Sequence, residues 1–155
     1  SQGMPFIFCG EEVFRHKQGT KNSYCSPDSI NAIDWTYKTM YKDLTDYYCG
    51  LASIRHAHPG FCLGDASLVR EKLEFIDIDD PCAVAFRISD LEGIDSAKSL
   101  VVLLNGSKKT LRVEIPEGNY KVLAQNGQAD ATGLGAYSGA YISARATSAT
   151  ILAQE

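Results

Sequence analysis

A polar, turn-rich stretch from Gly19 to Trp35 holds the side chains of this sequence that are best suited to binding chemistry. Its short hydrogen-bonding and aromatic groups belong to Asn22, Tyr24, Asp28 and Asn31. Loops of this length without regular structure are usually functional or disordered. Stiff amide and carboxylate groups beside one aromatic face suit the wall of a sugar-binding site. For Asp28 a second interpretation stays open, because Ser-Pro-Asp-Ser favours a helix N-cap or an Asx turn.

Two adjacent acids, Glu11 and Glu12, could suggest glycoside hydrolysis, which places one carboxylate on each side of the scissile bond. Neighbouring side chains on an extended chain point in opposite directions, so this pair cannot flank one bond. We expect the acids to pair with Arg15 or with a backbone donor. The sequence offers no Ser-His-Asp set, phosphate loop or internal repeat that would indicate another activity.

A zinc site could be considered at His56, His58 and Cys62, but a fourth ligand at suitable spacing is missing. We expect the two histidines to interact with the dipole at a helix C-terminus instead. The sequence therefore predicts no metal and no cofactor.

The loop needs elements on both sides to position it. Met4 to Cys9 is apolar at every position, which is typical of a strand covered on both faces, as in a parallel sheet flanked by helices. One such strand needs neighbours, so we expect that Ser1 is not a natural beginning. A missing fragment, another copy of the chain or the flank of the β-rich region would then cover Phe6 and Phe8.

A helix is predicted from Tyr41 to His56, where apolar residues recur at spacings of three and four and form one buried stripe. Pro59 and Gly60 end this helix soon after His58. We expect the helix to lie against the β-rich region that follows.

From Leu63 onward the sequence is rich in short β-type runs separated by turn clusters, which predicts an antiparallel β-sandwich. The predicted strands are Leu68 to Ile76, Cys82 to Ile88, Leu100 to Leu104, Thr110 to Ile115, Tyr120 to Ala124, Ala140 to Ala144 and Thr147 to Leu152. Turns are predicted at Asp79-Asp80-Pro81, Asn105-Gly106-Ser107 and Pro116 to Asn119. The Gly- and Ala-rich stretch Asn126 to Ser138 indicates a flexible hairpin or edge loop.

The 155 residues have the apolar and charged fractions of an ordinary globular protein, 45% and 22%. A net charge of −4 without a basic stripe argues against a nucleic-acid partner. No apolar run is long enough to span a bilayer, and no signal peptide opens the chain, so no membrane partner is predicted. Five scattered cysteines indicate free, buried thiols, which weakly favours a reducing, cytoplasmic compartment.

The run from Met4 to Trp35, MPFIFCGEEVFRHKQGTKNSYCSPDSINAIDW, resembles the segment after the last catalytic carboxylate in type I pullulanases, which are debranching enzymes of the α-amylase superfamily. In that family the chain forms the eighth strand of a (β/α)8 barrel and then a substrate-side loop of the pattern NSYxSPDSIN. The resemblance implies that residues 1–60 are the C-terminal end of a catalytic barrel, with strand 8, the substrate-side loop and helix 8. Residues 61–155 would form a C-terminal β-sandwich domain.

By the same resemblance, the loop would border the glucose-binding subsites on the non-reducing side through Asn22, Tyr24, Asp28 and Asn31. Asp28 would accept hydrogen bonds from sugar hydroxyls, and Tyr24 would supply a stacking or edge contact. This sequence departs from the family at His16, which replaces Thr in Arg-Thr-Lys, and at Cys25, where Asn or Asp is common. The family's catalytic carboxylates, a nucleophilic Asp, a proton-donating Glu and a second Asp, lie on earlier strands that this chain lacks.

The leading hypothesis is the C-terminal part of a pullulanase-like enzyme that cleaves α-1,6 bonds in pullulan, amylopectin or glycogen limit dextrins by a retaining mechanism. Its partners would be the α-glucan and the rest of the barrel, and the chain alone is expected to be inactive. An alternative is a non-catalytic carbohydrate-binding or interaction module, which would need an exposed platform from Tyr120, Tyr137 or Tyr141. A third is a truncated or proteolytic piece whose β-sandwich is the stable unit.

Overall fold

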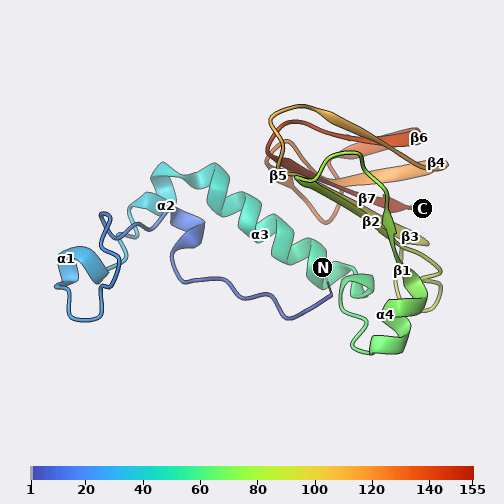
Figure 1. The fold of residues 1–155 in the computed structure, drawn as a ribbon. Helices are drawn as coiled ribbons and strands as arrows, with labels where there is room; N and C mark the ends of the chain where they lie inside the picture. Colours follow the sequence, from blue (N-terminus) through green and yellow to red (C-terminus); the bar gives the residue numbers. More distant parts are fainter. Residues whose placement is uncertain (1) are drawn as a thin grey trace.

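The computed structural model describes residues 2–155 as an N-terminal segment, a long helix and a β-domain (Figure 1). The segment lies apart from the sheet and contains η1 (Glu11–Val13), α1 (Asp28–Asn31) and α2 (Tyr37–Met40). Helix α3 (Lys42–Ala57) then leads to the β-domain, where η2 (Pro59–Phe61) and α4 (Ala66–Lys72) precede the strands. The predicted helix Tyr41 to His56 is therefore confirmed, shifted by one residue at each end.

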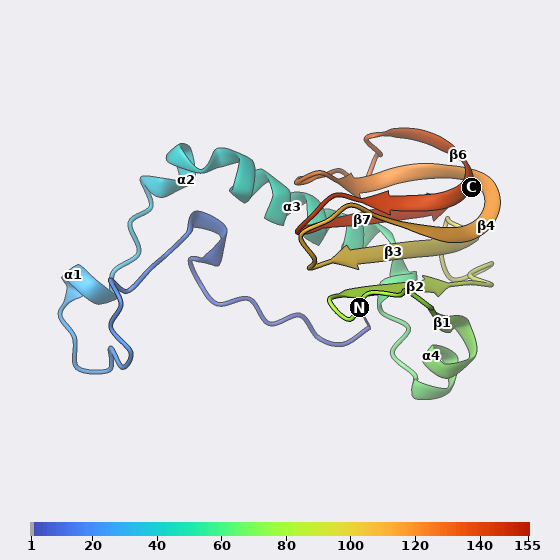
Figure 2. The ribbon, with the colours of Figure 1, turned by 45° about the horizontal axis from the view of Figure 1, so that its top comes forward.

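Seven antiparallel strands make one sheet in the order β1-β2-β3-β7-β4-β5, with β6 paired to β4. The strands are β1 (Leu73–Ile76), β2 (Ala83–Ile88), β3 (Ser99–Asn105), β4 (Leu111–Gln125), β5 (Gln128–Ala129), β6 (Gly135–Ala144) and β7 (Ser148–Gln154). Strand β4 pairs with β6 between Leu111 and Val122 and with β7 between Tyr120 and Gln125 (Figure 2). The prediction of an antiparallel β-domain is confirmed.

Two apolar cores lie on opposite faces of this sheet. The first contains Val101 and Leu103 of β3 together with Val113 of β4 and Ile142 of β6, so that β4 and β6 cover one face. The second contains Phe86, Ile88, Leu100 and Val102 from the other face and joins them to Ile54 of α3 and Phe61 of η2. Alternating side chains of β2 and β3 thus pack on both sides, which explains the nearly continuous apolar sequence of β3.

Two sequence-based boundaries in the β-domain are wrong. The strand predicted from Leu68 begins only at Leu73, because the carboxylate of Asp65 accepts hydrogen bonds from the backbone N–H groups of Ser67 (2.8 Å) and Leu68 (3.1 Å) and caps helix α4. The turn predicted at Pro116 to Asn119 lies inside β4, where the pairing register shifts between Glu114 and Gly118. A bulge accommodates a proline, which has no N–H to donate to the ladder.

The Gly- and Ala-rich stretch that was predicted as a flexible hairpin or edge loop is largely structured. Asn126 and Gly127 both have positive φ, 52° and 79°, and connect β4 to β5 in a two-residue turn. This is the backbone that an Asn-Gly hairpin turn requires. Strand β6 then begins at Gly135, five residues before the predicted start at Ala140.

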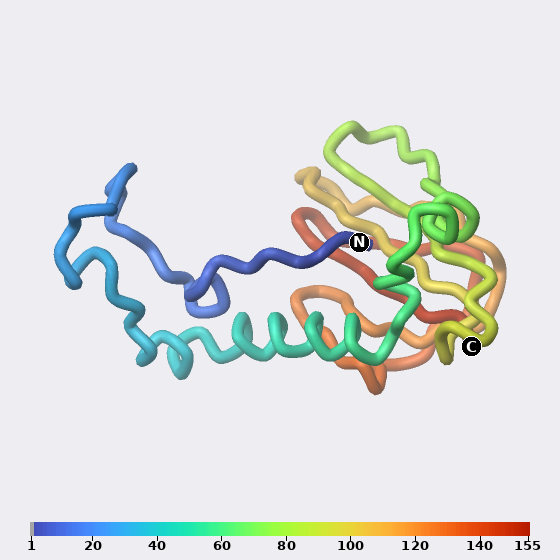
Figure 3. The backbone as a smooth tube through the Cα atoms, turned by 90° about the horizontal axis from the view of Figure 1, so that it is seen from below, coloured from blue at the N-terminus to red at the C-terminus, as the bar shows by residue number. Residues whose placement is uncertain are grey.

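Residues Met4 to Cys9, predicted as a strand, pair with no strand in residues 2–155. Met4 and Phe6 are 95% and 90% exposed, so the β-domain does not cover them. The segment is nevertheless held beside α3 at both of its ends (Figure 3). Whether it is a strand in a larger barrel stays a prediction.

The first of these anchors is at Gln2, whose side-chain amide donates to the carbonyl of Gly60 (2.7 Å) and accepts from the N–H of Leu63 (3.0 Å). The guanidinium of Arg55 also donates to the carbonyl of Gly3. The second anchor lies at η1, where the hydroxyl of Thr45 donates to the carbonyl of Glu12 (2.9 Å). Both anchors rest on α3 or on the loop that follows it.

Helix α3 approaches the β4–β5 hairpin very closely at Gly50. A Cβ atom at Gly50 would lie 2.1 Å from the carbonyl oxygen of Ala129, so only glycine fits without a shift of the backbone. One turn further along the helix, Ile54 is 1% exposed and packs into the core with Leu123 and Ala124. The expectation that the helix lies against the β-rich region is confirmed.

A buried pair fixes the end of α3 to the loop between β2 and β3. Nδ1 of His58 lies 2.8 Å from Oδ1 of Asp95, whose side chain is inaccessible to solvent. Asp95 also accepts hydrogen bonds from the N–H groups of Gly60 and Ala97, both at 2.9 Å. Burial alone raises the pKa of Asp95, but the donors at Ala97, His58 and Gly60 outweigh it, and the pKa lies below its ordinary value.

All five cysteines are free, as predicted, but each is exposed rather than buried. Among residues 2–155, no helix combines the length and apolar character needed to cross a membrane.

Replacing Gly50 with alanine is expected to destabilise the protein by about 1–3 kcal/mol, because the new methyl group meets the backbone of Ala129. Helix propensity alone would give the opposite sign, a gain of about 0.5–1 kcal/mol. Urea denaturation measures the difference, and Gly3→Ala is the control, since nothing lies within 4 Å of that position. A gain in stability for Gly50→Ala would contradict the close approach.

Replacing Asp95 with asparagine is expected to cost roughly 3 kcal/mol, because a buried charged acceptor loses its pairing with His58. A folded-state pKa below the unfolded value gives stability that is present above the unfolded pKa and is lost as the pH falls through the folded pKa. Stability measured from pH 6 to pH 2 should therefore fall less steeply in Asp95→Asn. If stability fell equally steeply with pH in the two proteins, the role assigned to Asp95 would be refuted.

Candidate functional site

Asn31 holds the predicted substrate loop together. Its amide nitrogen donates to the carbonyls of Ser23 and Ser26, both at 2.8 Å, and its amide oxygen accepts from Nζ of Lys17 (3.3 Å). The ammonium of Lys17 also donates to the hydroxyl of Ser23. Three segments that are separated by up to fourteen residues thus meet at one side chain. We infer that Asn31 sets the shape of the loop.

Arg15 joins this loop to the apolar segment before it. Its guanidinium donates to the carbonyls of Cys9 (3.2 Å) and Asn31 and lies 5.2 Å from the ring centroid of Phe8. Nζ of Lys17 lies 5.8 Å from the same centroid. Within residues 2–155, no carboxylate lies within 4.0 Å of either cation. Two positive charges without acidic partners therefore stand at the base of the loop.

The other predicted contact residues point outward. Tyr24 is 89% exposed, and its backbone N–H donates to the side-chain oxygen of Asn22 (3.2 Å). Asp28 is exposed and is the first residue of α1, after the N-cap residue Pro27. Its carboxylate takes part in no hydrogen bond in the described chain, so the N-cap and Asx-turn interpretation is wrong. The structure thus leaves Tyr24 and Asp28 available and engages the polar atoms of Asn31.

A hollow of about 190 Å³ lies behind the loop, and its lining includes Arg15, Ser29, Asp34 and Tyr37. The carboxylate of Asp34 accepts hydrogen bonds from the hydroxyl of Thr36 (2.6 Å) and from the backbone N–H of the same residue (3.0 Å). These bonds, the one from the hydroxyl most of all, hold the pKa of Asp34 below its usual value. Asp34 therefore stays ionised at neutral pH beside the cationic base of the loop. Nothing in the sequence pattern singled out this acid as part of the site.

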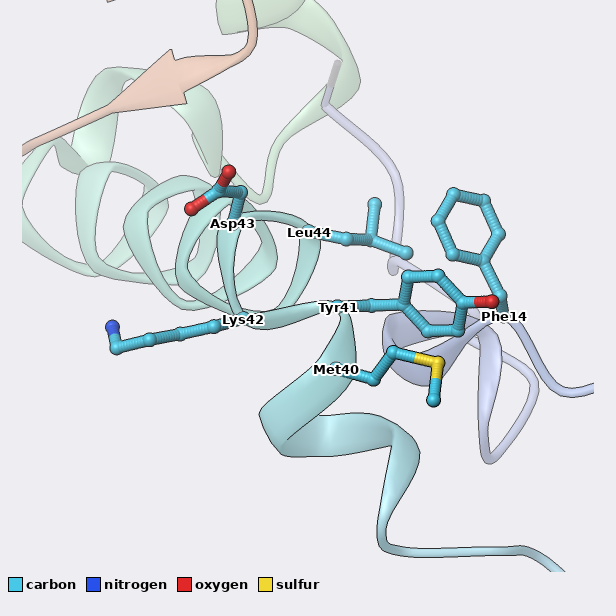
Figure 4. A pocket seen from close by; sticks show the side chains of 6 residues that line it. All are labelled: Phe14, Met40, Tyr41, Lys42, Asp43 and Leu44. Atoms are coloured by element: carbon cyan, nitrogen blue, oxygen red, sulfur yellow. The ribbon is translucent and has the colours of Figure 1, made fainter.

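A second hollow, of about 220 Å³, lies at the start of α3 (Figure 4). Phe14, Tyr41 and Met40 gather on one side of it, while the side chains of Lys42 and Asp43 point away. The rings of Phe14 and Tyr41 meet edge to face at 4.9 Å. Phe14 has a φ of 54°, which is uncommon for a residue with a side chain. Such an apolar lining favours packing against protein over binding of a sugar.

The other sequence candidates do not form a reactive set. Glu12 accepts a hydrogen bond from the N–H of Gly10 (3.0 Å), which confirms the expected pairing with a backbone donor. His58 interacts with Asp95, whereas we expected it to interact with the helix dipole. Residues 2–155 contain no group of three histidine, cysteine or acidic side chains arranged to hold a metal ion.

The sequence of this chain is similar to those of known proteins. A family model described as "Pullulanase, all-beta domain" matches residues 69–128. The chain is 38% identical over 116 residues to a pullulanase of Bacillus subtilis, a match that covers 75% of this chain and 16% of that protein. It is 27% identical over 135 residues to an isoamylase of a Flavobacterium species, covering 75% and 17%.

Solved structures extend the likeness to the whole chain. The pullulanase of Bacillus acidopullulyticus matches with a TM-score of 0.91 and 32% identity over 99% of this chain and 19% of that one. The pullulanase of an Anoxybacillus species in complex with maltotetraose matches with a TM-score of 0.89 and 28% identity over 100% and 22%. The chain thus spans about a fifth of these proteins. Because the matches include the N-terminal segment, its placement beside α3 is similar in those enzymes.

Replacing Asn31 with alanine is expected to loosen the loop, because two donated hydrogen bonds of about 0.5–1.5 kcal/mol each are lost. Amide hydrogen exchange at Ser26, whose N–H donates to the carbonyl of Ser23 (3.0 Å), should then be roughly tenfold faster. Asn22→Ala is the matched control, since that amide accepts only from Tyr24. Equal exchange rates in the two variants would refute the proposed role of Asn31 in holding the loop.

Proposed function

This chain is related to the pullulanases and matches about a fifth of their length, and on that premise we propose that it is the C-terminal part of a debranching glycoside hydrolase. In this proposal residues 1–60 complete a catalytic (β/α)8 barrel with strand 8, the substrate-side loop and helix 8. Residues 61–155 are the C-terminal β-sandwich domain. The parent cleaves α-1,6 bonds in pullulan, amylopectin or glycogen limit dextrins, and its catalytic carboxylates lie outside this chain.

The apolar segment Met4 to Cys9 is the observation that carries this proposal. The backbone of residues 4–7 makes no hydrogen bond within the described chain, and their side chains are exposed, although the segment is anchored at both ends beside α3. A strand between two others in a barrel would satisfy both backbone edges and bury both faces. Helix α3 would then be the helix that follows this strand, on the outside of the barrel.

The loop after that strand would stand at the active-site face, because in such barrels the segments after the strand C-termini form it. Asp28 and Tyr24, which are exposed and make no side-chain hydrogen bond, would contact a bound glucan there. Asn31 and Lys17 would keep the loop in its binding shape, and Asn22 would brace Tyr24. Preorganisation of this kind lowers the entropic cost of binding.

The alternative of a carbohydrate-binding module needs an exposed tyrosine platform, and the three candidate tyrosines do not provide one. Tyr120 is only 2% exposed. Tyr141 is 39% exposed, but the guanidinium of Arg112 lies 3.9 Å from its ring centroid and occupies the face that a sugar would need. Tyr137 is half-buried against the core. No open aromatic platform remains among the three.

The proposal is tested by Asp28→Ala in the full-length enzyme. Loss of a charged acceptor for sugar hydroxyls should cost about 1.5–3 kcal/mol of transition-state binding, which lowers kcat/KM for pullulan by roughly ten- to a hundredfold. The isolated 155-residue chain should show no hydrolysis at all. Steady-state kinetics with reducing-end detection provides the measurement.

Asp79→Ala is the matched control, because Asp79 is an exposed acid of the β-domain and should leave kcat/KM unchanged. Unchanged kcat/KM in Asp28→Ala would exclude the loop from the substrate site. Cleavage of pullulan by the isolated chain, abolished by mutating an acid within it, would overturn the proposal that the catalytic carboxylates lie elsewhere.

A further inference from the structure

The sequence contains two asparagine–glycine pairs, Asn105-Gly106 and Asn126-Gly127. In such a pair the backbone nitrogen of the glycine attacks the side-chain carbonyl carbon of the asparagine, because glycine has no Cβ atom to hinder the approach. The reaction closes a five-membered succinimide ring, and the amide nitrogen of the asparagine leaves as ammonia with the proton of the glycine N–H. Water then opens the ring at either carbonyl, which leaves an aspartate or an isoaspartate.

The first pair is held at both of its reacting groups. Asn105 is 3% exposed, and its Nδ2 donates to three backbone carbonyls at distances of 2.8 to 3.1 Å. Its Oδ1 accepts from the N–H (2.9 Å) and the hydroxyl (2.8 Å) of Ser107. The N–H of Gly106 donates to the carbonyl of Cys82 (2.9 Å). Ring closure here would leave buried polar groups unpaired, so the fold opposes it.

The second pair is open at both reacting groups. Asn126 and Gly127 are exposed and form the two-residue turn between β4 and β5. Within residues 2–155, the carboxamide of Asn126 and the N–H of Gly127 take part in no hydrogen bond. No atom lies within 4 Å of the place where a Cβ atom of Gly127 would stand. The side chain of Asn126 is therefore free to turn toward the glycine nitrogen, and water reaches both groups.

We propose that Asn126 is a site of spontaneous deamidation, and that the isoaspartate formed there weakens the contact of α3 with the sheet. Overall, the carboxamide and one water molecule give a carboxylic acid and ammonia, so the step needs no reactant other than water. Asn105 has the same following residue but a buried, fully bonded side chain. The fold thus confines the reaction to one of two pairs that are equivalent in sequence.

The effect on α3 follows from the position of the turn. Gln125 pairs with Gln128 directly across it, and β5 has only two residues. In an isoaspartate the main chain runs through the side chain and is longer by one methylene group, which a two-residue hairpin turn does not accommodate. The pairing then shifts, and Ala129 moves with it. Because the carbonyl oxygen of Ala129 lies against Gly50, the support of α3 is altered.

Peptide mapping of the purified protein tests the site. Trypsin places the two pairs in separate peptides, residues 99–108 and 122–145, and neither contains another asparagine. After incubation at mildly alkaline pH, digestion in weak acid and mass spectrometry follow the conversion of amide to acid. In the folded protein Asn126 should react at least roughly tenfold faster than Asn105, because reaction at Asn105 requires local opening.

The urea-unfolded protein is the control for intrinsic reactivity, and there the two asparagines should react at similar rates. Equal rates in the folded protein would overturn the proposal, because the fold would then make no distinction between the pairs. An Asn126 that reacts in urea but stays intact in the folded protein would overturn it as well.

Thermal unfolding of the incubated protein tests the effect on α3. The Tm of the wild-type protein should fall by several degrees as isoaspartate accumulates. Asn126→Gly removes the carboxamide and keeps a residue pair that favours the turn, so its Tm should stay constant during the same incubation. Asn22→Gly is the matched control and should lose stability like the wild type, since Asn22 is an exposed asparagine outside the β-domain. An equal fall of Tm in Asn126→Gly and the wild type would refute the link between deamidation and the helix contact.

Discussion

The close approach of helix α3 to the sheet is the contact on which the rest of this structure depends. Gly50 brings the helix against the backbone of the β4–β5 hairpin, and Ile54 fills the core beneath it. The pair of His58 and Asp95 then fixes the end of the helix to the β2–β3 loop. Since the N-terminal segment is anchored on α3 and on the loop after it, this contact also places the segment relative to the β-domain.

The N-terminal segment presents apolar side chains that the described residues do not cover. Phe6, for example, is exposed although the segment is anchored at both of its ends. Ordering the backbone costs about 1–2 kcal/mol per residue, which exposed side chains cannot offset. The solved pullulanases that share this arrangement are about five times as long. In our proposal, the catalytic barrel supplies the strands that cover this segment.

The sequence predicted those parts of the fold that depend on local pattern. Helix α3 and the antiparallel strands follow from periodicity, and the exceptions follow from local signals that compete with it, such as the cap at Asp65. The strand order did not follow, because β7 inserts between β3 and β4 through contacts distant in sequence. The contact at Gly50 and the pair of His58 with Asp95 are of the same kind. Their partners are separated by more than thirty residues.

In the candidate site, residue type identified the loop but did not assign roles within it. Asn31 and Asp28 lie on the same short helix and were predicted alike, yet their chemistry separates them. A primary amide has two N–H groups, and Asn31 uses them to bridge the carbonyls of Ser23 and Ser26. An ionised carboxylate only accepts, so Asp28 could not close the loop in this way, but it can accept from sugar hydroxyls. The donor requirement inside the loop therefore assigns Asn31 to holding it, and in our proposal it leaves Asp28 to face a ligand.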